Sequence, residues 1–146
     1  MRKDSDKQND QDGRAGLRVL IVDDSHRMRY CLRHQIESRT RHIVVGEAEN
    51  GKSAVELARR LKPDVILMDI EMPVMDGAKA TRLIRADVPD AQILAVSSYV
   101  DADRIRCMFK AGARGYIDKD RGGERLFEAI ETVAAGKRYL STAVED

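Results

Sequence analysis

The chain has 146 residues, of which 42% are hydrophobic and 35% charged, a composition typical of one globular domain with a real core. Its formal net charge of +1 gives no basic excess that would favour nucleic acid, and its apolar runs are too short to span a membrane. The polar N-terminus also lacks the apolar centre of a signal peptide. Cys31 and Cys107 lie in helix-like stretches, and we expect reduced core thiols in a cytoplasmic protein.

Apolar runs and helix-period stretches alternate along the chain. Residues 1–16 are polar and mixed in charge, and are expected to form a disordered N-terminal arm. Five short apolar runs predict strands at residues 17–22, 42–48, 64–68, 91–97 and 113–117. Apolar stripes at helical spacing predict helices at residues 25–38, 52–61, 77–86, 101–112 and about 126–136. Residues 137–146 are expected to be a C-terminal linker or tail.

Most of these predicted strands are apolar at nearly every position rather than at every second one. Such strands are buried on both faces, which predicts a parallel sheet covered by helices. Right-handed crossovers then give a doubly wound α/β domain over residues 17–136. Within it, Asn50 is the predicted N-cap of the second helix, and Pro63 is expected to end that helix.

Polar side chains follow four of the five predicted strands. Asp23 and Asp24 follow the first strand. Asp69 follows the third, Ser97 the fourth and Lys119 the fifth. Taken singly, each is what a strand shows where it leaves the core for water. Because function in an open parallel sheet gathers at the carboxyl ends of the strands, the set predicts a site with three carboxylates, a hydroxyl and an ammonium.

Three carboxylates held close together repel one another unless a cation neutralises them. Mg²⁺ binds carboxylate oxygens, backbone carbonyls and water, so Asp24, Asp69 and a carbonyl just after Asp69 are candidate ligands. Lys119 would then face an anion such as a phosphoryl group, and an aspartate in that setting can become an aspartyl phosphate. The alternative is that Asp23 and Asp24 only cap the following helix. We favour the metal role because Asp69 and Lys119 accompany them.

Four segments resemble the receiver domain of two-component response regulators. They read VLIVDDS, DVILMDIEMPVMDG, ILAVSS and GARGYIDKD, in this order and each at a predicted strand end. The resemblance covers about residues 17–136. It implies a flavodoxin-like, doubly wound (βα)5 fold with a five-stranded parallel sheet in the order 2-1-3-4-5. It also implies a signalling switch that promotes its own phosphotransfer and dephosphorylation, rather than an enzyme.

The resemblance implies a role for each matching acid. Asp69 resembles the phosphoacceptor, which a histidine kinase or a small phosphodonor charges. Asp24 resembles a direct Mg²⁺ ligand, and Asp23 resembles the acid that holds a metal-bound water. Glu71 occupies the position whose backbone carbonyl binds the metal. The side chains of Glu71 and Tyr99 lie where the family varies its dephosphorylation rate.

Three further residues resemble the parts of the switch. Ser97 resembles the hydroxyl that moves to the phosphoryl oxygens, and Lys119 resembles the lysine that pairs with them. Tyr116 resembles the aromatic side chain that turns inward when Ser97 moves. Many receivers have a cis-proline after this lysine, whereas Asp120 follows here, so the family's cis bond is not assumed for this chain and the conformation of the Lys119–Asp120 bond stays open.

The end of the predicted domain is similar to the NarL/FixJ subgroup, whose receiver precedes a LuxR-type helix-turn-helix. The similarity lies in GARGYIDKD and, further on, LFEAIETVAAGKRYLS. DNA contact is therefore expected only through an output domain absent from this chain. Two alternatives stay open, the receiver part of a longer transcription regulator and a stand-alone receiver that acts by protein contacts. The expected partners are a sensor histidine kinase and a second copy in a homodimer, and no membrane.

Two other functions compete with this interpretation. A Mg²⁺-dependent phosphohydrolase of the haloacid-dehalogenase type would use Asp69 as nucleophile. Such enzymes usually carry an aspartate where Glu71 stands, and no cap domain is visible in the sequence. A receiver-like domain that binds a partner without phosphorylation would not need the complete set of site residues found here.

A basic cluster surrounds the predicted fourth helix. Such a cluster is usually a solvated face, although in receivers this region also belongs to a signalling surface. Its members are Arg104, Arg106, Lys110 and Arg114.

Overall fold

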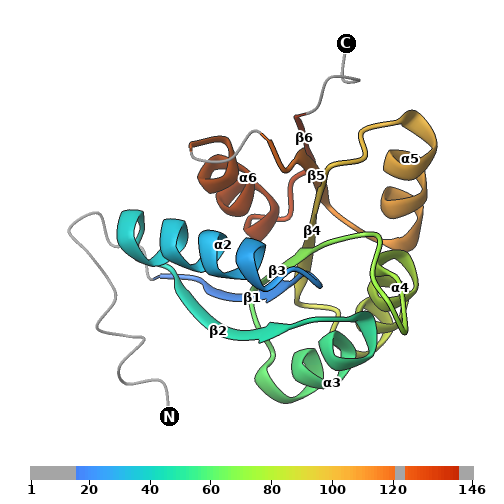
Figure 1. Cartoon of the computed structure of the whole chain (residues 1–146), viewed down its shortest axis with the longest axis horizontal. Helices are drawn as coiled ribbons and strands as arrows, with labels where there is room; N and C mark the ends of the chain where they lie inside the picture. The colour runs from blue at the N-terminus through green and yellow to red at the C-terminus, as the bar shows by residue number, and fades with distance from the viewer. Residues whose placement is uncertain (1–15, 121–123, 142–146) are drawn as a thin grey trace.

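The computed structural model describes residues 16–120 and 124–141 (Figure 1). The predicted disordered arm falls almost entirely outside these residues. The described residues form six strands and five helices. The strands are β1 (Arg18–Val22), β2 (Ile43–Ala48), β3 (Val65–Met68), β4 (Gln92–Ser97), β5 (Gly115–Asp118) and β6 (Tyr139–Ser141). The helices are α2 (His26–Arg39), α3 (Gly51–Leu61), α4 (Gly77–Asp87), α5 (Ala102–Ala111) and α6 (Glu124–Ala134).

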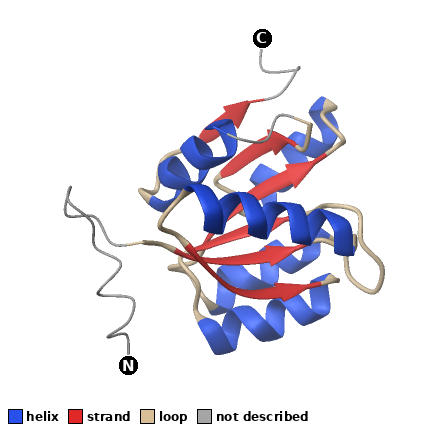
Figure 2. Ribbon diagram, turned by 60° about the vertical axis from the view of Figure 1, so that its left-hand side comes forward, coloured by secondary structure: helices blue, strands red, loops and turns tan. Residues whose placement is uncertain are grey.

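All neighbouring strands pair in parallel, in the order β2-β1-β3-β4-β5-β6. Helices cover both faces of the sheet (Figure 2). Successive residues of β1 point to opposite faces: Leu20 packs in the cluster formed with α3, α4 and α5. Ile21 packs in the cluster formed with α2 and α6. The predicted doubly wound, parallel α/β architecture is therefore confirmed. The inference that strands apolar at nearly every position are buried on both faces of a parallel sheet is confirmed with it.

The predicted number of strands is wrong by one. Residues 139–141, assigned to the linker, form β6 and pair with β5 in the register Gly115↔Tyr139 to Ile117↔Ser141. The chain reverses after α6 at Gly136, whose left-handed φ of 83° suits glycine. A three-residue edge strand has no periodicity of its own, so β6 forms only because the edge of β5 is available to pair with it.

The expectation of two core thiols is also wrong. Cys31 and Cys107 are free and exposed on α2 and α5. In α2 the buried residues are Leu32 and Ile36, so the apolar stripe is narrower than its sequence pattern indicates. Separately, none of the helices within residues 16–120 and 124–141 combines the length and apolarity needed to cross a bilayer.

The start of α3 tests whether local sequence chemistry fixes an element of this fold. Asn50 is the N-cap as predicted, and its Oδ1 accepts a hydrogen bond of 2.9 Å from the Ser53 backbone N–H. We expect Asn50→Ala to lower the free energy of unfolding by about 1 kcal/mol, because that N–H loses its acceptor. Asn50→Asp keeps an acceptor and should retain wild-type stability in urea titrations. Equal stability of the alanine variant would contradict this account.

Candidate functional site

Two carboxylates are fixed side by side because they follow two neighbouring strands. Val22 pairs with Met68, so Asp23 and Asp69 are the first residues after β1 and β3 and lie next to each other. Their backbones extend the hydrogen-bond ladder: Asp23 N donates to Ala48 O and Asp69 N donates to Val22 O, both at 3.0 Å. Both aspartates are buried. The strand ends therefore hold two acids together in surroundings where charge is poorly solvated.

The third acid completes an oxygen cluster at this edge. Carboxylate oxygens of Asp23, Asp24 and Asp69 all lie within 4.8 Å of one another, and Asp24 is exposed. Helix capping does not explain the pair after β1, because Ser25 is the N-cap of α2 and its Oγ accepts from Met28 N. Hard oxygen donors at this spacing fit a divalent ion such as Mg²⁺, with the exposed side left for water.

Lys119 supplies the positive charge of the cluster. Its Nζ lies 2.9 Å from Asp23 Oδ2 and 3.5 Å from Asp69 Oδ1. Its backbone N–H donates to Ser97 O at 2.9 Å, which fixes it beside the end of β4. No cis peptide bond occurs in the described parts of the chain, so the bond from Lys119 to Asp120 is trans. One ammonium thus bridges two buried carboxylates.

The electrostatics of the cluster leave Asp69 short of compensation. Burial and the negative charge of Asp23 raise the pKa of Asp69 from its ordinary 3.8 to about 6. Lys119 and the Ile70 N–H bond to Asp69 Oδ1 (2.8 Å) oppose this rise in pKa. Burial alone would lower the pKa of Lys119, but its pairs with Asp23 and Asp69 raise it overall. The lysine therefore stays charged, while Asp69 lacks enough cationic charge around it.

The loop after Asp69 closes tightly on the strand end. Asp76 is the N-cap of α4, with Oδ1 accepting from Lys79 N at 2.9 Å. The Gly77 N–H donates to Ile70 O at 2.8 Å. A Cβ at Gly77 would overlap the backbone carbonyl of Asp69. The loop therefore requires glycine there, because its backbone passes directly against the phosphoacceptor candidate.

The hydroxyl and aromatic residues predicted to form a switch lie together. Ser97 is fully buried at the end of β4, and its Oγ accepts a hydrogen bond of 3.0 Å from Tyr99 N. Tyr116 is also fully buried, and its hydroxyl donates to Tyr99 O. Burial raises the pKa of Tyr116, while a hydrogen bond with Ser97 opposes the rise in pKa. Tyr99 thus connects the two side chains through its backbone.

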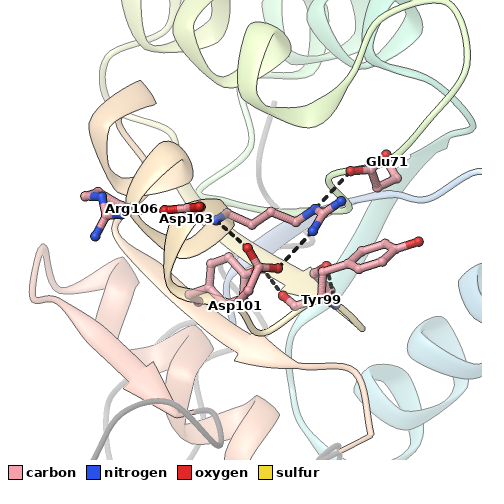
Figure 3. Close-up of polar contacts among 8 residues, drawn as sticks. Glu71, Tyr99, Asp101, Asp103 and Arg106 are labelled. Atoms are coloured by element: carbon pink, nitrogen blue, oxygen red, sulfur yellow. Dashed lines mark hydrogen bonds and ion pairs between the residues drawn. The ribbon is translucent and has the colours of Figure 1, made fainter.

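Sequence reasoning left the side chain of Glu71 open and missed its partner. The Glu71 carboxylate lies 3.1 Å from Nε of Arg104 (Figure 3). Local sequence pattern places Arg104 only in the basic cluster. Arg104 Nη1 also lies 2.9 Å from Asp101 Oδ1. Of the basic cluster, Arg104 and Arg106 are paired with acids, Arg106 with Asp103 at 2.6 Å. No sequence pattern predicts the pair with Glu71, because the two residues are 33 positions apart.

A parallel sheet with three carboxylates and one lysine at its carboxyl edge is the arrangement of a receiver-type α/β domain. Residues 19–131 match the family described as response regulator receiver domain. The chain therefore belongs to the response regulator receiver domain family.

Curated relatives include transcription regulators that are longer than this chain. Response regulator GacA of Pseudomonas aeruginosa is 37% identical over 128 residues, 88% of this chain and 60% of that protein. The transcriptional regulatory protein DegU of Brevibacillus brevis is 35% identical over 136 residues, 93% of this chain and 58% of that protein. The chain thus spans about three fifths of the length of these relatives.

Solved structures agree with the fold and the subgroup. A two-component response regulator of the LuxR family from Aurantimonas sp. SI85-9A1 has a TM-score of 0.83 at 35% identity, covering 88% of this chain and 92% of that chain. The receiver domain of response regulator NarL from Mycobacterium tuberculosis has a TM-score of 0.80 at 30% identity, covering 84% and 98%. The predicted resemblance to NarL/FixJ receivers is confirmed.

The charge imbalance at Asp69 predicts that neutralising this side chain raises the free energy of unfolding, by an amount that depends on pH. Its pKa of about 6 in the folded protein exceeds its ordinary value of 3.8, so the ionised side chain destabilises the fold. This destabilisation develops as the pH rises from about 4 to about 6 and is complete above that range. With chelator present, we expect Asp69→Asn to raise the free energy of unfolding by about 1–2 kcal/mol near neutral pH, allowing for solvent screening.

The gain should disappear below about pH 4, where the carboxyl is protonated in both states. Asp90→Asn is the control, because Asp90 is an exposed acid in the turn before β4. Urea titrations across this pH range give the measurement. An Asp69→Asn variant no more stable than wild type near neutral pH would show that the carboxylate is well compensated.

Proposed function

We propose that the chain is a phosphorylation-activated switch of a two-component system, with Asp69 as the phosphoacceptor. The observation that supports this most is Lys119, whose ammonium lies between Asp23 and Asp69 beside a third carboxylate, Asp24. A group of oxygens with one ammonium suits a site that receives both a divalent cation and a phosphoryl group. A sensor histidine kinase is the proposed donor.

The proposed reaction transfers a phosphoryl group to a carboxylate oxygen. The bond between phosphorus and the kinase's histidine nitrogen breaks, and a bond forms to an Asp69 Oδ. Lys119 pairs with the phosphoryl oxygens and offsets their charge. Asp24, Asp69 and the Glu71 backbone carbonyl are the proposed Mg²⁺ ligands, with Asp23 acting through a water. The ion, when bound, neutralises charge on the carboxylates and the transferring group.

The raised pKa of Asp69 is consistent with this need for cations. A pKa of about 6 leaves the carboxylate largely ionised, and therefore nucleophilic, at neutral pH. Positive charge brought to the cluster would lower that pKa further. The same residues would be strained electrostatically without a cation and satisfied with one, which favours the metal-dependent reaction over a purely structural role.

The proposed signal is a change in the population of two arrangements of the switch residues. Ser97 Oγ now accepts from Tyr99 N, and a phosphoryl oxygen on Asp69 would offer its hydroxyl a charged acceptor. Movement of Ser97 toward that oxygen would shift Tyr99, and with it the hydroxyl contact of Tyr116. Dimerisation or contact with an output domain is the proposed consequence.

We propose that this receiver, residues 17–136, belongs to a cytoplasmic DNA-binding transcription regulator. The edge strand β6 adds Tyr139–Ser141 to the sheet of this domain, and DNA would be bound only by an output domain. The support is that DegU is a transcriptional regulator of which this chain spans about three fifths. The second candidate is a stand-alone receiver that acts by protein contacts. In both cases the domain is a switch that promotes its own phosphotransfer and dephosphorylation.

The proposal predicts one phosphoryl group on wild-type protein after incubation with acetyl phosphate and Mg²⁺, measured by intact mass. Asp69→Asn should gain none, because an amide is not a nucleophile here. Asp90→Asn, the same chemical change at an exposed turn, should be labelled like wild type. Chelation of Mg²⁺ should abolish labelling.

Two results would count against the proposal. Equal labelling of Asp69→Asn and wild type would place the acceptor elsewhere. Repeated turnover of small phosphoesters, measured as phosphate release exceeding the protein concentration many times over, would instead favour the phosphohydrolase.

A further inference from the structure

The Arg104 side chain makes three contacts with the loops that follow Asp69 and Ser97 of the candidate site. Its Nε lies 3.1 Å from Glu71 Oε2, its Nη1 lies 2.9 Å from Asp101 Oδ1, and its Cζ lies 4.2 Å from the centre of the Tyr99 ring. Figure 3 shows Glu71, from the loop after β3, and Tyr99 and Asp101, from the loop before α5, converging on one point. We call Arg104 with these three partners the Arg104 clamp.

The clamp joins the two loops that leave the central strands. Glu71 comes two residues after Asp69, in the loop after β3, and Tyr99 comes two residues after Ser97, in the loop after β4. These strands are neighbours in the sheet, so their loops leave the same edge. Arg104 reaches both loops from the first turn of α5, where its own backbone N–H bonds the N-cap Asp101 at 3.1 Å.

Tyr99 is the residue on which the clamp and the switch meet. Its backbone N–H bonds Ser97 Oγ at 3.0 Å, and its backbone carbonyl accepts from the Tyr116 hydroxyl. Tyr99 is 46% exposed, and its ring lies under the Arg104 guanidinium. If Ser97 leaves its hydrogen bond with Tyr99 N, Tyr99 is therefore affected, and the Tyr99 side chain is held by Arg104.

The strength of the clamp comes from its geometry rather than from any one ion pair. Arg104, Glu71 and Asp101 are each about half exposed, and a single pair of this kind stabilises little. The planar guanidinium, however, serves two carboxylates and one aromatic face at the same time. Since all three contacts require the same position of Arg104, they reinforce one another and fix Tyr99 in one place.

We propose that Arg104 is a positioning residue that holds Tyr99 where its backbone N–H bonds Ser97 Oγ, which keeps the Ser97 hydroxyl from a phosphoryl oxygen and thereby slows phosphorylation of Asp69. The inference rests on the proposed function, because it concerns regulation of that same site. Without the clamp, Tyr99 and Ser97 reach the arrangement that receives the phosphoryl group more often. Loss of a contact network of this kind is expected to change that population about fivefold.

The first test needs no phosphorylation. Arg104→Gln removes the clamp, and Arg106→Gln removes a neighbouring, exposed pair of the same helix, that with Asp103. Hydrogen exchange of the Tyr99 backbone N–H, followed by NMR on the unphosphorylated chain, should be about fivefold faster in Arg104→Gln. It should be unchanged in Arg106→Gln, and amides of the central strands should exchange equally in all three proteins.

The second test measures the rate of phosphorylation by acetyl phosphate with Mg²⁺, in which acetate leaves as the Asp69 Oδ–P bond forms. Arg104→Gln should react about fivefold faster than wild type or Arg106→Gln. Arg104→Lys should be intermediate, because an ammonium does not span two carboxylates and stack at once. The double variant with Glu71→Gln should react no faster than Arg104→Gln alone, because both changes open the same contact.

Each result decides something. Equal Tyr99 exchange in Arg104→Gln and Arg106→Gln would overturn the clamp, whatever the phosphorylation result. Faster exchange with an unchanged phosphorylation rate would overturn its regulatory role. If wild type takes up no phosphoryl group, the proposed function falls together with that regulatory role, while the exchange data still report whether Arg104 holds Tyr99.

Discussion

The position of one ammonium between two buried carboxylates is the constraint on which the site depends. Lys119 lies 2.9 Å from Asp23 and 3.5 Å from Asp69, so it compensates one acid more fully than the other. Asp69 keeps a raised pKa as a result, with burial as the first cause. A protein selected only for stability would gain by neutralising this acid. The fold accepts poor electrostatics at Asp69, a feature that is common at reactive sites.

The surrounding structure explains how such an arrangement holds together. Asp23 and Asp69 are rigid because their backbones continue the ladder of β1 and β3. Lys119 is rigid because its N–H bonds the end of β4. Since Asp23, Asp69 and Lys119 are each hydrogen-bonded to a neighbouring strand through their backbone, their charges cannot separate by moving a loop away. The sheet thus holds the carboxylates in place against a repulsion that would separate them on a flexible chain.

Long, chemically distinctive features were predictable from sequence, and contacts between distant segments were not. The strands that are apolar throughout indicated the parallel sheet, and Asn50 indicated the start of α3, because each depends on neighbouring residues. The edge strand β6 forms only by pairing with β5, a contact that the local sequence does not indicate, and it was therefore not predicted. Local pattern placed the acids at one edge, since parallel strands end together. Local pattern could not predict the partners of Arg104. An arginine on a helix surface has the same sequence context whether it is solvated or paired with a residue 33 positions away, as Arg104 is with Glu71.

In the proposed switch, Lys119 and Arg104 act on opposite sides of the same equilibrium. Lys119 is largely but not fully buried and already pairs with Asp23, so it is in place to receive a phosphoryl oxygen without large movement. Arg104 is half exposed and holds Tyr99, whose backbone bonds Ser97. The first cation therefore favours the charged product, and the second favours the state that precedes it. The proposed switch uses both contributions. If the interactions favoured only the phosphorylated arrangement, the domain would adopt that arrangement before any signal arrived.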